Sequence, residues 1–217
     1  MQNGTIIVLA WPEGMVKNAD SWYDFFLSKN GMYRVGHSAI ILINNELESI
    51  NYFDFGRYHT PNGFGRVRDE VTDPDLEILT KPKIKNNNLT NLDSILLETA
   101  DKKSTHGKGK MYASVMKKVS FTKSYNCAKK LQKKDMIVYG PLNIFGTNCS
   151  RFVSKLMFKS LNFSFKKIRL FLPITISPSP KRNVSIANND YYVIENKKIK
   201  TIKKSFLKSY FTSIENY

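Results

Sequence analysis

The first half of the chain alternates short apolar runs with polar breaks, a pattern that predicts strands. Residues 5–10 (TIIVLA) form a β-branched run typical of a buried strand, and residues 11–14 (WPEG) end it. Residues 35–43 (VGHSAIILI) predict the clearest strand of the sequence. A turn signal at residues 44–45 (NN) follows, and residues 47–55 (LESINYFDF) predict the second arm of a hairpin.

Apolar positions at helical spacing occur further along the chain. Residues 88–103 predict an amphipathic helix, and residues 148–161 predict another with Phe152 and Leu156 on its apolar face. The remaining predictions are a helix at 18–27, a polar loop at 56–74, a third strand at 76–79, a helical stretch at 108–134 that breaks near Ser120, a short strand at 136–139, and a hairpin formed by 191–195 and 198–202.

These elements predict one α+β domain over residues 1–205 and a basic tail over residues 206–217. No apolar run approaches the roughly 20 residues that a membrane-spanning helix needs. The first ten residues lack the basic n-region of a signal peptide. We therefore expect a cytoplasmic protein, and a non-classical secretion route remains open.

The net charge of +16 is unevenly distributed. Residues 1–80 carry −5, residues 81–149 carry +10 and residues 150–217 carry +11. Most of the excess is lysine, and it accompanies abundant Asn, Ile, Tyr and Phe, which is the composition that an AT-rich genome produces. The lysine-rich C-terminal half is expected to contact polyanions or anionic membrane weakly. Without an Arg-rich strip or zinc-finger spacing, we expect no specific recognition of nucleic acid.

The chain holds two cysteines, Cys127 and Cys149, and three histidines, His37, His59 and His106. Two cysteines exclude a disulfide-stapled scaffold and any four-cysteine zinc or iron–sulfur site. Three histidines argue against a histidine-rich metal cluster. The sequence therefore predicts chemistry without a metal or a cofactor.

The sequence around Cys149 (GTNCSRFV) places this cysteine at the start of a helix. Gly146 ends a turn, and Thr147 or Asn148 can cap the helix that follows. The N–H groups of the first turn and the helix dipole stabilise the thiolate, which is the nucleophilic form. The same N–H groups can bind an oxyanion that develops on an attacked carbonyl. Cys127 has no Gly-rich turn ahead of it, and we interpret it as structural.

His37 lies on the strand at residues 35–43, which is otherwise apolar. Because side chains alternate along a strand, it shares a face with Ala39 and Ile41. A lone histidine in such a position is more often a core residue. Beside Cys149, however, it would hold the thiol proton and complete a nucleophile–base pair.

A third polar residue would orient the imidazole of His37. A two-residue turn at 44–45 places Tyr52 opposite His37, and a slip of one or two residues places Asp54 there. Asp54 is an acid among aromatic residues, and a buried carboxylate needs a partner. We select Asp54 as the third residue, with Asn51, Tyr52 and Glu48 as alternatives.

These motifs and their order resemble the circularly permuted papain-like superfamily, which includes NlpC-like hydrolases and lecithin–retinol acyltransferase-like enzymes. The resemblance rests on Gly36-His37 on an apolar strand before a hairpin, and on Asn148-Cys149-Ser150 opening a helix far downstream. It covers residues 35–75 and 145–157, and the segments 52–58, 63–68 and 72–75 resemble a bacterial branch of that group. It implies a Cys–His–polar triad and an antiparallel sheet against which the cysteine-bearing helix packs.

The sequence therefore predicts a cysteine hydrolase that cleaves an amide, ester or thioester through an acyl-enzyme, with peptides or amides as the first substrate class. The residues expected on the substrate side are Trp11, Arg57, His59 and Asn148. The region of Trp11 would add an oxyanion donor, and Arg57, with Arg66 and Arg68, would hold a carboxylate or phosphate. These arginines are equally compatible with ion pairs to Asp69, Glu70 and Asp73.

Three other interpretations remain open at this point. The first is an acyltransferase or lipid-directed thiol enzyme of the same fold. The second is a non-catalytic basic module that binds a polyanion or an acidic partner. The third is a toxin or effector whose target is a protein of a host or competitor, which the sequence does not distinguish from a housekeeping hydrolase.

Overall fold

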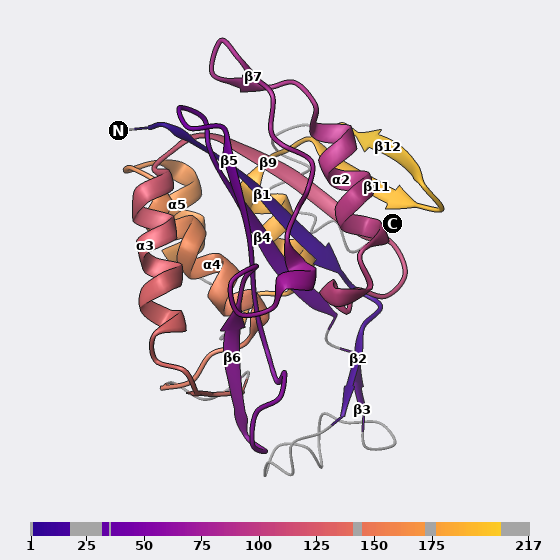
Figure 1. Cartoon of the computed structure of the whole chain (residues 1–217), viewed down its shortest axis with the longest axis vertical. Coiled ribbons are helices and arrows are strands. Elements are labelled where there is room, and N and C mark those ends of the chain that lie inside the picture. The colour runs from indigo at the N-terminus through magenta and orange to yellow at the C-terminus, as the bar shows by residue number, and fades with distance from the viewer. Residues whose placement is uncertain (1, 18–31, 35, 141–144, 172–176, 205–217) are drawn as a thin grey trace.

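The computed structural model describes residues 2–17, 32–34, 36–140, 145–171 and 177–204, and within them an eight-stranded antiparallel sheet forms the centre of the fold (Figure 1). The strand order is β10-β6-β5-β4-β1-β9-β11-β12. The strands are β1 (Gly4–Trp11), β4 (His37–Asn44), β5 (Ser49–Gly56), β6 (Phe64–Arg68), β9 (Met111–Val119), β10 (Ile137–Val138), β11 (Tyr191–Glu195) and β12 (Lys198–Ile202). Two small pairs lie outside this sheet, β2 (Met15–Lys17) with β3 (Met32–Arg34) and β7 (Ile84–Lys85) with β8 (Asn88–Leu89).

Helices cover both faces of the sheet (Figure 1). One face is covered by α2 (Leu92–Asp101). The other is covered by α3 (Phe121–Gln132), α4 (Cys149–Ser160), α5 (Phe165–Phe171) and α6 (Pro180–Ala187). The sheet is therefore the middle layer of three.

Side-chain alternation along β1 divides the core into two layers. Ile6 and Val8 point toward the layer under α3–α6, whereas Ile7 and Leu9 point toward α2. All eight residues of β1 are buried, because the strand lies mid-sheet with helices on either side. A strand buried on both faces needs a continuous apolar run, which is the pattern of residues 5–10.

α4 packs on β4 and β5 through a fully buried apolar stripe that includes Phe152, Val153 and Leu156. Its start is fixed by Asn148, whose side-chain oxygen accepts a hydrogen bond of 2.9 Å from the N–H of Arg151. The cap sets where the helix begins and the stripe sets its rotation, so together they fix the position of its first residue, Cys149.

The structure confirms an α+β fold with a large antiparallel sheet, and it confirms most of the predicted elements. The confirmed elements are the strands at 5–10, 35–43 and 136–139, the hairpin arm at 47–55, the helices at 88–103 and 148–161, and the final hairpin. The first of these helices, α2, is shorter than predicted. The predictions for residues 18–27 and 206–217 lie outside the described residues.

The predicted helix at 108–134 is wrong in its first half, where the chain forms β9. This strand lies between β1 and β11 and is buried at every position over residues 111–116. A strand buried on both faces shows no alternation, so its Met and Ala residues resemble a helix. The predicted break near Ser120 is confirmed, because the Ser120 hydroxyl caps α3 by accepting the N–H of Lys123.

Three other local predictions are wrong. The loop at 56–74 contains β6, and in place of a strand at 76–79 the chain forms a 3-10 turn at Pro74–Leu76. The hairpin turn is longer than two residues, because Asn44 pairs with Ser49 rather than with Glu46. The Asn44 side chain accepts the N–H groups of Glu46 and Leu47, and this Asx-type turn lengthens the loop.

Within the described ranges, no helix combines the length and the apolar character needed to cross a membrane.

Replacing Phe152 with alanine tests the packing of α4. The side chain is fully buried between the helix and the sheet, so we expect the free energy of unfolding in urea to fall by about 3–5 kcal/mol. Phe163→Ala is the matched control, because that ring is 88% exposed, and it should change the value by less than about 0.5 kcal/mol. Similar losses in both variants would contradict this placement of α4.

Candidate active site

His37 and Cys149 are the first residues of β4 and α4, and both lie at the same end of the sheet. Gly36 turns the chain into β4 with a φ of +65°, and a Cβ there would lie 2.6 Å from the carbonyl oxygen of Trp11. Its N–H donates to the carbonyl of Gly14 at 2.9 Å. Only glycine fits this left-handed, crowded position, so the glycine that precedes His37 is a geometric requirement.

The Cys149 residue is 7% exposed. Burial alone would raise its pKa. Hydrogen bonding to His37 and the positive charge of its ring outweigh that effect and lower the pKa of Cys149 below its ordinary value. The backbone N–H of Ser38 and the Ser150 hydroxyl lower this pKa further. The position favours the thiolate, as its place in the first turn of α4 predicts.

The second ring contact of His37 is to Asp54. The Nε2 atom lies 3.2 Å from Oδ2 of Asp54. Asp54 lies on β5, where it is the cross-strand partner of Ala39 on β4. Ala39 is two residues beyond His37, so Asp54 and His37 lie on the same face of the sheet. Burial by itself would lower the pKa of His37, but the hydrogen bonds and negative charges of Asp54 and Cys149 together raise it to about 9.

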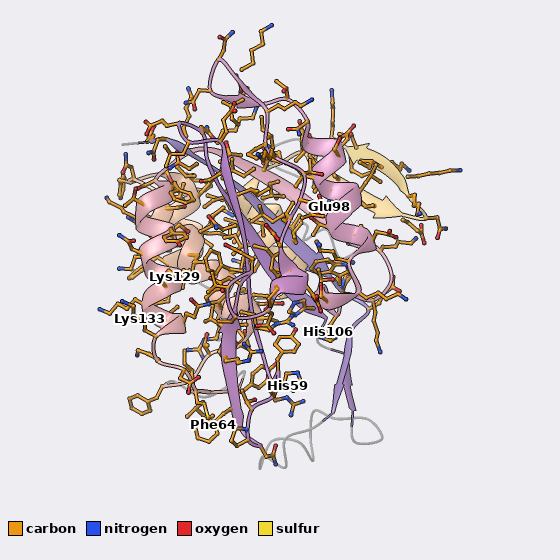
Figure 2. The ribbon with its side chains drawn as sticks, in the orientation of Figure 1. His59, Phe64, Glu98, His106, Lys129 and Lys133 are labelled. Atoms are coloured by element: carbon orange, nitrogen blue, oxygen red, sulfur yellow. The ribbon has the colours of Figure 1, made fainter. Side chains whose placement is uncertain are left out.

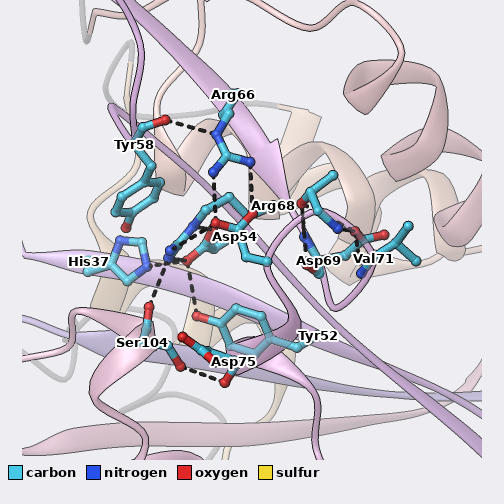
Figure 3. A network of polar contacts seen from close by, with 12 residues as sticks. His37, Tyr52, Asp54, Tyr58, Arg66, Arg68, Asp69, Val71, Asp75 and Ser104 are labelled. Carbon is cyan, nitrogen blue, oxygen red and sulfur yellow. Dashed lines mark hydrogen bonds and ion pairs between the residues drawn. The ribbon is translucent and has the colours of Figure 1, made fainter.

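Asp54 is fully buried and is held by Arg68 as well as by His37 (Figure 3). Nε and Nη2 of Arg68 donate to its two oxygens at 3.0 and 2.6 Å, and the hydroxyl of Tyr52 lies 3.2 Å from Oδ2. Burial favours the neutral acid, but the hydrogen bonds and charges of His37 and Arg68 lower the pKa of Asp54 below its usual value. The carboxylate therefore stays ionised beside the imidazole.

Aromatic side chains enclose this polar cluster. The indole of Trp11 stacks on the His37 ring with centroids 5.8 Å apart, and Tyr58 meets the same ring edge-on at 6.3 Å. The guanidinium of Arg68 lies 3.4 Å above the Tyr58 ring, and His106 stacks on Tyr58 at 5.0 Å. Burial raises the pKa of Tyr58 well above its ordinary value, so the phenol stays neutral.

The residues predicted for the substrate side have mixed positions. Trp11 lies in the cluster, whereas Arg57 lies over the ring of Tyr139 at 5.3 Å. His59 is exposed and lies nearer the outer end of the β5–β6 hairpin, away from His106 (Figure 2). The amide of Asn148 caps α4 and donates to Ser177 at 2.9 Å, so both of its ends serve the local structure.

The alternatives for the third residue are separated by their contacts. Tyr52 contacts Asp54 rather than His37. Asn51 donates to Glu70 at 2.5 Å, and Glu48 accepts the N–H of Ile84 at 3.2 Å. Of the four residues considered, Asp54 is the one hydrogen-bonded to His37.

Four groups of this cluster were not predicted from the sequence: Arg68, Tyr58, His106 and the N–H of Ser38. Arg68 was considered only for a substrate anion or a loop ion pair. Because residues 56–74 were predicted as a loop, no strand register connected it to Asp54, whereas in the structure the two are cross-strand partners. Arg66 does form a predicted ion pair, with Asp73 at 2.7 Å.

The part of the chain that the structure describes brings together no group of three or more His, Cys, Asp or Glu side chains suited to a metal ion.

The structure thus defines an α+β protein with a buried cysteine–histidine–aspartate cluster at one end of an antiparallel sheet. A family model described as type VI secretion system effector TseH-like matches residues 6–164, and the chain belongs to this family. The crystal structure of the type VI secretion system effector TseH matches with a TM-score of 0.64 and 19% identity, covering 92% of this chain and 98% of that chain. At this identity the match shows a shared fold. No curated protein matches the chain.

Replacing Arg68 with methionine tests the ion pair that holds Asp54. The change leaves a fully buried carboxylate without its guanidinium partner, and we expect the free energy of unfolding at neutral pH to fall by about 3–5 kcal/mol. Arg66→Met breaks a more exposed pair and should cost about 1 kcal/mol or less. The double variant Arg68→Met with Asp54→Asn should recover part of the loss. An undiminished loss in the double variant would exclude the buried charge as its cause.

Proposed function

We propose that this chain is a cysteine hydrolase of permuted papain-like fold, with Cys149 as nucleophile, His37 as acid–base and Asp54 as the residue that orients His37. The observation that carries the proposal is a chain of interactions through one ring: His37 lowers the pKa of the Cys149 thiol, and Nε2 of the same ring lies 3.2 Å from the buried carboxylate of Asp54. Chains of nucleophile, base and orienting group are the geometry by which covalent catalysis is recognised.

The pKa values favour an ion pair before substrate arrives. The pKa of Cys149 is lowered and that of His37 is raised to about 9, a combination that favours transfer of the thiol proton to the ring. The thiolate attacks the carbonyl carbon and forms a C–S bond. The tetrahedral intermediate then expels the amine as the C–N bond breaks, and the His37 imidazolium gives the amine its proton.

Water completes the cycle at the same ring. Neutral His37 takes a proton from a water molecule, whose oxygen attacks the thioester carbonyl of the acyl-enzyme. The C–S bond breaks, the acid leaves, and the thiolate and the imidazolium are restored. Asp54 stays ionised throughout, because Arg68 and Tyr52 satisfy its oxygens whether or not the ring is protonated.

The first turn of α4 supplies the oxyanion donors. Helix geometry gives the N–H groups of Cys149 and Ser150 no partner within the helix, whereas those of Arg151 and Phe152 bond to Asn148. An oxyanion formed on the carbon bonded to Cys149 Sγ lies within reach of these donors.

Amides and peptides remain the substrate class that we propose. The effector role of the family extends the proposal: the chain would be delivered by a type VI secretion system and would hydrolyse its substrate in a recipient cell. The predicted cytoplasmic location then describes the protein before export.

Incubation of the protein with p-nitrophenyl acetate, followed by peptide mass spectrometry, tests the proposal; we expect an acetyl group on Cys149. Acetylation elsewhere, or none, would refute the role of Cys149, and transfer to an added amine rather than to water would favour an acyltransferase.

Alkylation distinguishes the two thiols. At neutral pH, iodoacetamide should modify Cys149 at least about tenfold faster than Cys127, because the pKa of the first is lowered and burial raises that of the second. The measurement is the rate of carbamidomethylation of each cysteine, resolved by mass spectrometry. Cys127→Ala should leave the fast phase intact, and Cys149→Ala should remove it. A fast phase that survives Cys149→Ala would end the nucleophile assignment.

The pH dependence of ester hydrolysis should be bell-shaped. The rate rises with pH as Cys149 reaches the thiolate, below its ordinary pKa, and falls as His37 loses its proton near pH 9. Asp54→Asn removes the charge that raises the pKa of His37, so the alkaline limb should move to lower pH. Circular dichroism verifies that this variant is folded. A folded variant with an unmoved alkaline limb would contradict the role of Asp54.

A further inference from the structure

The outer side of α3, α4 and α5 belongs to the most basic part of the chain. Residues 121–171 contain eleven lysines and arginines and one acidic residue, Asp135. Some of these cations are used within the protein: Lys129 pairs with Asp69, Lys166 donates to the carbonyl of Ala187, and Lys167 donates to that of Leu161. The remaining lysines of the two longer helices are the ones of interest.

Lys130, Lys155 and Lys159 lie around the thiol of Cys127, where α3 and α4 pack side by side. All three side chains are exposed, on two helices that pack together. Burial raises the pKa of the Cys127 thiol, and the positive charges of these lysines oppose the rise. Lys134 follows Lys130 by one turn, just beyond the end of α3. These four lysines form no ion pair with any described acidic residue. Figure 2 shows Lys133 close to the end of α3.

A pocket of about 420 Å³ opens on the same face, between the end of α3, α4 and α5. The pocket is lined by both aromatic and cationic side chains, which include Phe145, Phe158, Phe171, Lys134, Arg151 and Lys155. Phe158 and Phe171 stack with centroids 6.3 Å apart. Phe145 is 94% exposed and Phe171 is 70% exposed, so two phenylalanines project from the rim of a basic pocket.

Together, Phe145, Phe171, Lys130, Lys134, Lys155 and Lys159 form what we call the basic-aromatic surface. We propose that this surface docks onto an anionic lipid bilayer, with the lysines at the headgroup phosphates and the two rings inserted at the acyl boundary. Lysines that have no acidic partner gain Coulomb energy near an anionic leaflet, and exposed phenyl rings gain from leaving water.

The composition favours a bilayer over an acidic protein as the occupant. Lysine is depleted at protein–protein interfaces, where the apolar residues form a packed central patch. Here lysines outnumber the exposed rings, which lie at Phe145 and at the end of a short helix. Interfacial membrane anchors combine these features, a basic polar surface and a few protruding aromatic residues.

Docking would also set the position of the candidate active site. α4 carries Cys149 at its first residue, and Lys155 and Lys159 lie along its outer side. The pocket is also lined by Gly146 and Thr147, which directly precede the cap of that helix. A bilayer bound to this surface would therefore lie along the helix that begins with the nucleophile. The inference does not depend on the proposed function, because membrane binding is measured without turnover.

Co-sedimentation of the full chain with lipid vesicles tests the proposal. We expect binding to vesicles of phosphatidylcholine that contain phosphatidylglycerol, little binding to phosphatidylcholine alone, and weaker binding as salt rises. The double variant Lys134→Glu and Lys155→Glu should lower the partition coefficient at least about tenfold. Phe145→Ser with Phe171→Ser should lower it by a similar factor, because the rings no longer insert.

Matched variants elsewhere on the surface serve as controls. Leu47→Ser with Leu79→Ser removes two side chains that are 75% and 73% exposed, and Lys85→Glu with Lys200→Glu reverses two exposed charges. Both controls should stay within about twofold of the parent chain. Circular dichroism confirms that each variant is folded.

Three results would overturn the proposal. The first is the absence of binding to the phosphatidylglycerol vesicles. The second is binding that the controls weaken as much as the surface variants do. The third is tighter binding to polyglutamate or to duplex DNA than to vesicles, with no effect of the phenylalanine variants, which would assign the surface to a soluble polyanion.

Discussion

The buried ion pair between Asp54 and Arg68 is the interaction on which the candidate site depends. A carboxylate with no exposed surface persists as an anion only where cations and hydrogen-bond donors replace water. Arg68 provides two of those donors from the adjacent strand, and Tyr52 lies within hydrogen-bonding distance of the same carboxylate. This leaves Asp54 charged and fixed, so it can orient His37. Without the arginine, the acid would be neutral or the sheet would have to admit water at this end.

The sheet brings the cluster together through neighbouring strands. β6, β5, β4 and β1 are consecutive, and they carry Arg68, Asp54, His37 and Trp11 in that order. The cysteine comes from outside the sheet, at the start of a helix that packs on β4 and β5. The position of the thiol relative to the ring is therefore set by the buried stripe of α4 and by its Asn148 cap rather than by a flexible loop.

The sequence predicted what local chemistry determines. Residues 5–10 and 35–43 read as strands because each is an apolar run, and residues 148–161 read as a helix because a cap precedes a 3.6-residue period. It failed where tertiary burial removes the period, as in β9. The sequence analysis paired Cys149 with His37. The contacts of Asp54 depend on the register between β4 and β5, which the Asn44 turn shifts. The contacts of Arg68 depend on β6, whose sequence resembles a loop. Pairing across strands is non-local, so a single sequence carries little of it.

The charges of the cluster alternate, and this arrangement makes one proton acceptor dominant. In the ion-pair state that we propose, thiolate, imidazolium, carboxylate and guanidinium follow one another, so the buried group has no net charge and avoids the cost of an isolated ion. His106 lies on the far side of Tyr58, where burial and the positive charges of Arg68 and His37 lower its pKa. At neutral pH this second imidazole is uncharged and does not compete for the thiol proton. The ring beside the thiol is therefore the one that the electrostatics of the fold prepare to carry it.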